Sequence, residues 1–333
     1  MQNVSAQYPR GANLVKNRLW IMSSKAEFTR HSLSRLGEEA AQLDIDLSIY
    51  RPDELTWEFR DSGQLCVFDT ELRSLPLPQV LFTKMGSSTM NHRCRDLMLA
   101  CESTGRIKVV NSTQTYRMLG DKWSTFQNAK VADLPVAHSL FVDTVESFDQ
   151  AVTSLGLPFV LKDPFGARGE AVNLIETRLQ VEEFRERVLR GDRKFIAQEY
   201  LSDSHGRDIR ILVVGSRIVG AIERRSVEGG FLANISQGGT AHPIDLNLEM
   251  RQIAQTCIER FGLSMGGIDL LHRANGYVLC EINLGAQFKG MEDGTGMNIA
   301  RQILVSLTED SSILPSETRP DIRPVFAAGQ LHS

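Results

Sequence analysis

The sequence lacks several features that mark large classes of proteins. No apolar run approaches the roughly 20 residues that span a bilayer, and the opening MQNVSAQYPRGANLVKNR lacks the apolar core of a signal peptide. A net charge of −4 over 333 residues gives no general attraction to nucleic acid or to an anionic membrane. We therefore expect a cytoplasmic protein whose partners are neither nucleic acids nor membranes.

Cysteine is scarce, and its spacing excludes two kinds of site. The five cysteines form no C-x-x-C pair and no cysteine and histidine pattern typical of zinc, so we expect free, mostly buried thiols. The first predicted strand is not followed by Gly-x-Gly-x-x-Gly, and a later glycine loop is not followed by Gly-Lys-Ser/Thr. The dinucleotide fingerprint is therefore absent from the first domain, and the glycine loop is not a Walker A loop.

What is present is the composition of a folded, enzyme-sized chain. Hydrophobic residues make up 42% and charged residues 23%, and this length provides a large core and two or three subdomains. Residues 1–16 are polar and aperiodic, which predicts a flexible N-terminus, and residues 310–333 are rich in Ser and Pro, which predicts an exposed tail. The oligomeric state stays open, with a homo-oligomer among the alternatives.

The first part of the chain alternates apolar runs with helical periodicity. Strands are predicted at 18–23, 45–50, 65–69 and 80–83, with helices between them that include 27–43 and 92–104. Strands that alternate with helices predict a mainly parallel sheet.

From Asn111 the pattern changes to shorter strands and tight turns. The stretch LPFVLKDPFGARGEAVNLIE predicts an antiparallel hairpin, and DIRILVVGSRIVGAIERRS predicts two strands joined at Gly215-Ser216. Two more strands follow in GIDLLHRANGYVLCEIN. Helices are predicted for GDKWSTFQNAK and for 144–155, 177–190, 249–261 and 297–307.

The glycine loop lies directly after an apolar strand that ends in Lys162. In Gly166-Ala167-Arg168-Gly169 the glycines let backbone N–H groups approach an anion, and Lys162 would place an ammonium near the same phosphates. The alternative is an ordinary hairpin turn with a solvated lysine, and the loop alone does not decide between the two.

Two further strand ends carry groups suited to a nucleotide. The segment 198–201 offers backbone groups that can read a base edge, and Asp208 can accept hydrogen bonds from ribose hydroxyls. The alternative for Asp208 is a surface salt bridge with a nearby arginine such as Arg210. Arg224 and Arg225 face opposite sides of a sheet, so one of them suits a phosphate in a cleft unless this edge is solvated.

The clearest signal is a pair of acids inside apolar strands. Asp269 lies six residues before Asn275 and Glu281 five after Gly276, so the acids fall nearly opposite one another across the turn. Asn283 shares a strand face with Glu281. Two carboxylates this close repel unless a cation lies between them, and such oxygen ligands suit Mg²⁺. In another register the acids would face water.

Several ordered stretches carry a resemblance to a known family: DKWSTFQ, PFVLKDPFGARGEAV, QEYLSDSHGRDIRILVVGSRIVGAIERRS, NISQGG, GIDLL and EIN. Together they resemble the RimK-like amino-acid ligases of the ATP-grasp superfamily, over about residues 111 to 305. NRLWIMSS, SHGRDIR and KDPFGARGEAV look most similar to N-acetylaspartylglutamate and β-citrylglutamate synthases. Bacterial ligases that add glutamate to a ribosomal protein look like a somewhat more distant match.

The resemblance implies an α/β (α+β) chain with the ATP-grasp fold. A Rossmann-like pre-ATP-grasp domain would be followed by a central lid domain and a C-terminal ATP-grasp domain. The implied limits are 17–110 for the first domain, 111–197 for the second and 198–309 for the third, between the flexible residues 1–16 and the tail 310–333.

The resemblance also implies roles for individual residues. Arg224, with Arg210 beside it, would stabilise the γ-phosphate and an acyl phosphate, and Asp208 would hold the ribose. The metal ligands would be Asp269, Glu281 and Asn283, the set that the charge argument reaches independently. The remaining nucleotide-binding residues would be Lys122, Lys162, Gly166, Gly169, Gln198, Glu199, Tyr200 and Asn234.

The implied activity is ATP-dependent ligation of a carboxylic acid to an amine through an acyl phosphate. ATP and Mg²⁺, or Mn²⁺ in its place, would be required, and the substrates would be a small or peptide carboxylic acid and an amino acid such as glutamate. The alternatives are a non-catalytic ATP-binding regulatory protein of the same fold and a phosphotransferase that stops at a phosphorylated product.

Two departures from the family pattern leave the substrates open. Members that modify protein ends carry Ser-Pro-Gly shortly after the metal-binding Glu-x-Asn, where this sequence has Gly285-Ala286-Gln287. A segment that often carries an arginine reads GGFLAN here, with Leu232 and Ala233. Both departures fall where the acid and the amine are expected to bind.

Overall fold

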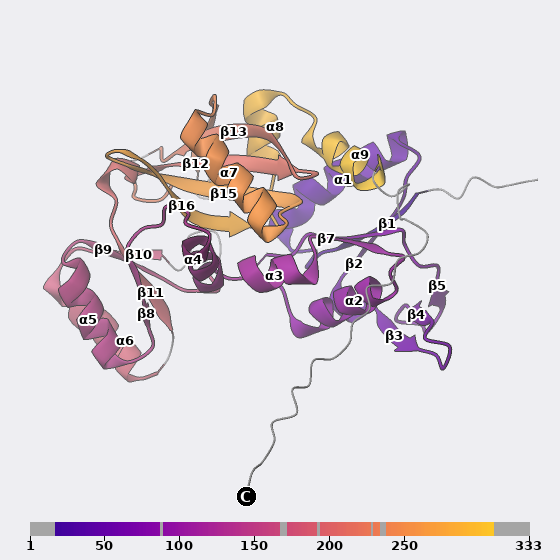
Figure 1. Cartoon of the computed structure of the whole chain (residues 1–333), viewed down its shortest axis with the longest axis horizontal. Helices are drawn as coiled ribbons and strands as arrows, with labels where there is room; N and C mark the ends of the chain where they lie inside the picture. The colour runs from indigo at the N-terminus through magenta and orange to yellow at the C-terminus, as the bar shows by residue number, and fades with distance from the viewer. Residues whose placement is uncertain are drawn as a thin grey trace, which may run out of the picture.

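The computed structural model describes residues 17–86, 89–166, 172–191, 194–227, 229–233 and 238–309. The predicted flexible N-terminus and tail, together with Gly169 and Asn234, lie outside these residues. Figure 1 shows a mixed α/β chain in which a small sheet with α5 and α6 lies at one end and the N-terminal sheet at the other. In the described ranges no helix combines the length and apolarity needed to cross a membrane.

The N-terminal part contains the expected parallel sheet, in the order β2-β1-β6-β7. Helix α1 (Arg30–Gln42) connects β1 to β2, and α2 (His92–Ser103) connects β6 to β7. Helical crossovers of this kind are what parallel strands require. The strands are β1 (Arg18–Met22), β2 (Asp46–Tyr50), β6 (Val80–Thr83) and β7 (Lys108–Val110).

The predicted strand at 65–69 is real, but its placement in the parallel sheet was wrong. It is β4 (Leu65–Phe68), which pairs antiparallel with β3 (Thr56–Phe59) and β5 (Ser74–Leu75) in a separate sheet. Only short turns join these strands, and a short turn can connect only antiparallel neighbours.

A second body is the four-stranded sheet that we call the lid sheet, in the order β10-β9-β11-β8. Its strands pair antiparallel, as the hairpin pattern predicted for β9 and β10. Helices α5 (Val145–Leu155) and α6 (Arg178–Leu189) pack on it, around the fully buried Phe148 and Phe159. The strands are β8 (Ser139–Val142), β9 (Phe159–Lys162), β10 (Val172–Ile175) and β11 (Phe195–Glu199).

The third body is a five-stranded antiparallel sheet in the order β14-β13-β12-β15-β16. Asp269 in β15 pairs directly with Glu281 in β16, and a bulge follows Asp269. The prediction that the two acids lie nearly opposite one another is therefore confirmed, although the turn is at Ala274-Asn275, one residue earlier than predicted, and the bulge completes the pairing. The strands are β12 (Arg207–Val214), β13 (Arg217–Arg225), β14 (Thr240–Pro243), β15 (Met265–Arg273) and β16 (Gly276–Asn283).

Five helices join and cover these sheets. Helix α7 lies near its predicted position, and α4 carries the predicted KWSTFQNAK segment. Sequence analysis missed several short elements, which are the helices α3 and α8 and the strands β3, β5, β7, β8 and β14. The C-terminal helix α9 returns to pack on α1, where Leu36 and Ile303 share one core cluster. The helices are α3 (Thr113–Leu119), α4 (Lys122–Val131), α7 (Leu248–Phe261), α8 (Lys289–Thr295) and α9 (Ile299–Glu309).

Asn111 connects the N-terminal parallel sheet to the five-stranded antiparallel sheet through hydrogen bonds. It follows β7, is 1% exposed, and its Nδ2 donates to the Met265 carbonyl at 2.7 Å. Its Oδ1 accepts from the backbone amides of Ser264 at 3.0 Å and Met265 at 2.9 Å. One side chain thus satisfies three backbone groups where β15 begins, and the two that belong to Met265 are buried.

Replacing Asn111 by Ala is expected to destabilise the protein by about 2–5 kcal/mol, because buried backbone groups left without partners each cost about 1–3 kcal/mol. Urea unfolding followed by circular dichroism measures the change. The exposed Asn275 provides the matched Asn→Ala control. Equal stability of N111A and N275A would contradict this role for Asn111.

Candidate functional site

One cavity of about 590 Å³ lies where the three bodies meet. Its wall is formed by the carboxyl end of β6, the start of α4, the lid strands β9 and β11, and the strands β12, β13, β15 and β16. The sequence predicted fourteen site residues, and all but Gly169 and Asn234, which lie outside the described residues, line this cavity. The structure therefore brings together residues that lie up to 161 positions apart, from Lys122 to Asn283.

Lys122 is the first residue of α4, which begins there because the Asp121 side chain caps it by accepting from the Ser124 amide at 2.9 Å. The Lys122 ammonium donates to the carbonyl oxygen of Gly166 and lies 3.7 Å from Glu281 Oε2. It therefore links the glycine turn of the lid sheet to the strand that carries the predicted metal ligands.

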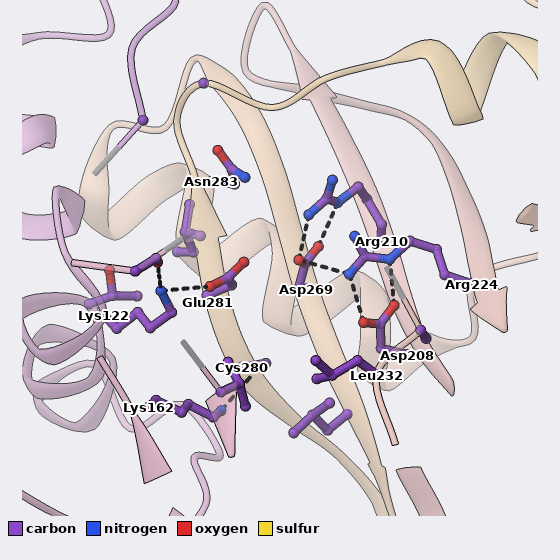
Figure 2. Close-up of a pocket in the computed structure, with 18 of the residues that line it drawn as sticks. Lys122, Lys162, Asp208, Arg210, Arg224, Leu232, Asp269, Cys280, Glu281 and Asn283 are labelled. Carbon is purple, nitrogen blue, oxygen red and sulfur yellow. Dashed lines mark hydrogen bonds and ion pairs between the residues drawn. The ribbon is translucent and has the colours of Figure 1, made fainter. Parts of the chain in front are cut away.

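Lys162 ends β9 and points into the cavity from the lid sheet (Figure 2). Its Nζ donates to Gln198 Oε1 at 2.6 Å and lies 3.6 Å from Cys280 Sγ. Burial raises the pKa of the Cys280 thiol, and the nearby Lys162 ammonium offsets this only in part. The thiol therefore stays protonated at neutral pH, the form in which a cysteine is a poor nucleophile.

Four charged side chains form a network on three neighbouring strands (Figure 2). Arg210 pairs through Nε and Nη2 with both oxygens of Asp269, at 2.7 and 2.6 Å, and Arg224 pairs in the same way with Asp208, at 2.6 and 2.7 Å. Arg224 Nη2 also lies 3.0 Å from Asp269 Oδ2. Each bidentate pair joins residues that are direct partners in the sheet register.

This network explains the pKa directions in the cavity. Burial raises the pKa of the Asp208 carboxyl against the lowering effect of Arg224. Burial also acts to raise the pKa of Asp269, but Arg210 and Arg224 together hold it below its usual value. Burial disfavours the charged form of Arg224, yet the carboxylates of Asp269 and Asp208 outweigh this and raise its pKa. Asp269 and Arg224 are therefore charged at neutral pH.

The salt-bridge alternative for Asp208 correctly anticipated an arginine partner, but the partner is Arg224, whereas Arg210 binds Asp269. The reason lies in the register, because Asp208 faces Arg224 across β12 and β13, and Arg210 is two residues further along β12. The pair is also not a surface feature, since Arg224 is 3% exposed.

The predicted metal ligands differ in whether they already form ion pairs within the protein. The charge argument assumed that a metal separates Asp269 from Glu281, but the two arginines already neutralise Asp269. Glu281 is partly exposed to the cavity, and Asn283 lies on the same face of β16. Within the described ranges, no group of three His, Cys, Asp or Glu side chains is arranged to hold a metal. Glu281 and Asn283 fit a cation that also binds phosphate oxygens, and ligation by Asp269 stays a prediction.

The predicted adenine contacts lie at the end of the lid sheet. The Glu199 amide donates to the His138 carbonyl at 2.9 Å, and the Glu199 side chain accepts from the His138 amide at 2.9 Å. The Glu199 N–H is thus engaged within the protein. Tyr200 follows, with its hydroxyl 2.6 Å from His205 Nδ1. Adenine recognition by these two residues remains a prediction.

Sequence analysis missed Lys84, which lines the cavity and is 4% exposed. Its ammonium donates to the Ala286 carbonyl at 2.8 Å and lies 5.3 Å from the centre of the Phe288 ring. Burial lowers the pKa of Lys84 to about 7. One signal was available, because Lys84 directly follows the strand VLFT, and the carboxyl ends of parallel strands are common sites for ligands.

Replacing Lys84 by Met is expected to raise the free energy of unfolding at pH 6 by on the order of 2 kcal/mol, since a buried ammonium costs about 1.4 kcal/mol per unit of pKa shift, less its hydrogen bond. Between pH 7, the approximate pKa of Lys84 in the folded protein, and pH 10.5, its ordinary pKa, Lys84 binds a proton in the unfolded state but not in the folded state. Wild-type stability therefore rises with pH through this window, and the advantage of K84M shrinks by pH 10.

Urea unfolding at pH 6 and pH 10 measures this difference. Lys130→Met is the matched control, because Lys130 is exposed on α4. A K84M variant that is less stable than the wild type at pH 6 would show that the ammonium is not a net cost.

Comparisons with known proteins identify the family and the fold. The model of the RimK-like ATP-grasp domain family matches residues 118–307. The chain is 29% identical over 221 residues to a probable alpha-L-glutamate ligase of Haemophilus ducreyi, which covers 66% of this chain and 72% of that protein. It is 26% identical over 292 residues to beta-citrylglutamate synthase B of Danio rerio, which covers 85% of this chain and 72% of that protein.

Solved structures show the same fold at low sequence identity. A RimK domain ATP-grasp protein of Sphaerobacter thermophilus superposes with a TM-score of 0.65 at 18% identity, over 87% of this chain and 99% of that one. The ATP-grasp ligase PsnB, complexed with a minimal precursor, Mg and ADP, gives a TM-score of 0.67 at 17% identity, over 91% of this chain and 100% of that one. The family match covers more than half of the sequence, so the chain belongs to the RimK-like ATP-grasp domain family, a family of ATP-dependent ligases.

Proposed function

We propose that this ATP-grasp ligase activates the carboxylate of a small acid or a peptide end with ATP and joins it to an amino acid, glutamate foremost. The observation that carries the proposal is that two lysines, two arginines and the oxygen ligands of β16 line one cavity. The names of two relatives, an alpha-L-glutamate ligase and a beta-citrylglutamate synthase, support glutamate as the amino acid.

The nucleotide phosphates would lie between Lys122 and Lys162, which reach the cavity from α4 and from the lid sheet. Two ammonium groups on opposite walls suit the distributed negative charge of a triphosphate. Gly166 lies in the turn that Lys122 contacts, so the start of the glycine loop is held beside the expected phosphates. Asp208 keeps its predicted contact with the ribose, for which it must share its carboxylate with Arg224.

Arg210 and Arg224 would stabilise the charge of the transferred phosphoryl group. Their bonds to Asp269 and Asp208 use Nε and Nη2, so in the described structure Nη1 of each guanidinium makes no such bond. The aspartates fix the orientation of both arginines before any substrate binds. Groups that are oriented in advance need little reorganisation at the transition state, which is the main source of electrostatic catalysis.

Mg²⁺ would be held by Glu281 and Asn283, with Asp269 as the third predicted ligand and Mn²⁺ as an alternative ion. It would supply neutralisation of the phosphate oxygens. The solved structure of PsnB, an ATP-grasp ligase with the same fold, is complexed with Mg and ADP, which supports this requirement.

The reaction follows from the weak electrophilicity of a carboxylate. One carboxylate oxygen attacks the γ-phosphorus of ATP, the bond from this phosphorus to ADP breaks, and an acyl phosphate forms. The amine nitrogen then attacks the acyl carbon, the carbon–oxygen bond to phosphate breaks, and the nitrogen loses a proton. Positioning and charge neutralisation are the protein's contribution, which matches the residues in the cavity.

A screen of carboxylic acids with ATP, Mg²⁺ and hydroxylamine tests this proposal. Hydroxylamine replaces the amino acid and traps the acyl phosphate, so we expect hydroxamate and ADP in equal amounts. ATP binding with no turnover for any acid would favour the regulatory alternative. A stable phosphorylated product without hydroxamate would favour the phosphotransferase.

Replacing Glu281 by Gln should lower kcat/KM by roughly 10²- to 10³-fold, the loss typical of one charge-stabilising group at a transition state. Circular dichroism should show an unchanged fold, because Glu281 is partly exposed. Glu58→Gln on the distant strand β3 is the matched control and should keep full activity. Full activity of E281Q would exclude Glu281 as a metal ligand.

A further inference from the structure

Lys84 occupies the position in the N-terminal sheet where a ligand is most expected. The chain leaves β1 towards β2 on one side, whereas β6 pairs with β1 on the other side. At such a switch point the crevice beyond the carboxyl ends of the strands is open, and ligands of α/β proteins bind there. Lys84 is the first residue beyond β6 and lines the cavity at this crevice.

The backbone around Lys84 is fixed from two sides. The Lys84 amide donates to the Met22 carbonyl at 2.8 Å. The Tyr116 hydroxyl from α3 lies 2.9 Å from the Thr83 carbonyl and 3.0 Å from the Met85 carbonyl. The ammonium is therefore held at a defined place, as recognition of a small ligand requires.

The ammonium of Lys84 lacks an anionic partner within the described structure. Burial alone lowers its pKa, with no contribution from a nearby carboxylate, and its hydrogen bond there goes to a neutral acceptor, the Ala286 carbonyl. The other two N–H groups of the ammonium therefore donate no hydrogen bond to the described residues. An unpaired buried ammonium destabilises a protein, which is the usual mark of a group that meets its counter-charge in a ligand.

Polar groups from two other elements face the same end of the cavity. The Ser32 hydroxyl in α1 donates to Gln287 Oε1 at 2.6 Å, which joins α1 to the segment that departs from the family pattern. His31, one residue earlier, has a buried Nε2 without a hydrogen-bond partner, 3.6 Å from Glu292. His31, Ser32 and Gln287 line the cavity, whereas Glu292 does not. This end of the cavity therefore offers further polar groups to an anion.

This end of the cavity connects directly to the reaction centre. Gly285 packs so closely on the N-terminal domain that a Cβ there would lie 2.8 Å from Gly86 N, and only glycine fits. A Cβ on Gly86 would lie 3.9 Å from Oδ1 of Asn283, one of the predicted metal ligands. Lys84 is two residues from Gly86, a span of at most roughly 7 Å of extended chain.

We infer that Lys84 binds a carboxylate that does not react, on a substrate whose reacting group lies at the phosphates. The reaction then uses a substrate with an additional carboxylate about one short carbon chain away from its reacting group. This inference rests on the proposed function for the position of the reacting group. The non-reacting carboxylate belongs either to the acid that is activated or to the incoming amino acid, and two arms of one experiment separate these sources.

Isothermal titration calorimetry on the full chain provides the first measurement, because it needs no turnover. The acid arm compares succinate with succinamate, and the amine arm compares L-glutamate with L-glutamine, so each pair differs by one charge. We expect the wild type to bind the charged member more tightly in at least one arm, by roughly 10- to 100-fold, the range of one charge-assisted hydrogen bond.

In Lys84→Met the preference in that arm should disappear, and Lys130→Met should keep it. Lys84→Gln guards against misfolding of K84M, because glutamine can still donate to the Ala286 carbonyl while it removes the charge. Loss of preference in the acid arm assigns the carboxylate to the acid, and loss only in the amine arm assigns it to the amino acid. A wild type without preference in either arm, or an unchanged preference in both variants, would overturn the inference.

The second measurement separates this inference from the proposed function. Hydroxamate formation from the acids of the screen tests the ligase alone, and the calorimetry tests Lys84 alone. If the wild type makes no hydroxamate but K84M loses the preference for the charged ligand, the carboxylate site is supported and the ligase function is refuted. If the wild type makes hydroxamate and K84M has the same KM and the same ligand affinities, the ligase function is supported and the carboxylate site is refuted.

Discussion

The site depends on one network of two arginines and two aspartates, set by the register of three antiparallel strands. Asp208 faces Arg224 across β12 and β13, and Arg210 faces Asp269 across β12 and β15, so each ion pair is also a cross-strand pair. Buried ion pairs seldom add stability, because the cost of removing charges from water offsets their attraction. Orientation of the guanidinium groups towards the cavity is the better explanation, and a shift of one residue in β12 would destroy it.

The sequence predicted this part of the fold well where signals were local. Counting outward from a predicted turn was enough to place Asp269 nearly opposite Glu281, whereas the bulge that completes their pairing was not predicted. The partners of Asp269 could not be predicted in this way, since Arg210 lies 59 positions earlier and meets it only through the pairing of β12 with β15. The sheet of the strand at 65–69 was predicted wrongly for a related reason. Periodicity identifies a strand, but it does not show which sheet the strand joins.

The segment 284–288 connects strand β16, which carries two of the predicted metal ligands, to the N-terminal sheet. Ala286 accepts a hydrogen bond from Lys84, Gln287 from Ser32, and Gly285 packs against the backbone at Gly86. This is the segment in which the Ser-Pro-Gly pattern of related ligases is absent. Its contacts give a physical reason to propose that substrate choice lies here. A change in these residues would reposition groups from both sheets at the cavity, while the lysines predicted to bind phosphate would keep their places.

The central claim is that ATP activates a carboxylate as an acyl phosphate, and transfer of oxygen tests it most directly. The acid that reacts in the screen would be labelled with ¹⁸O in its carboxylate, and the released phosphate would be analysed by mass spectrometry. An acyl phosphate keeps the carboxylate oxygen that attacked the phosphorus, so we expect one ¹⁸O in each phosphate and the other in the amide. Unlabelled phosphate, released together with amide, would contradict the account.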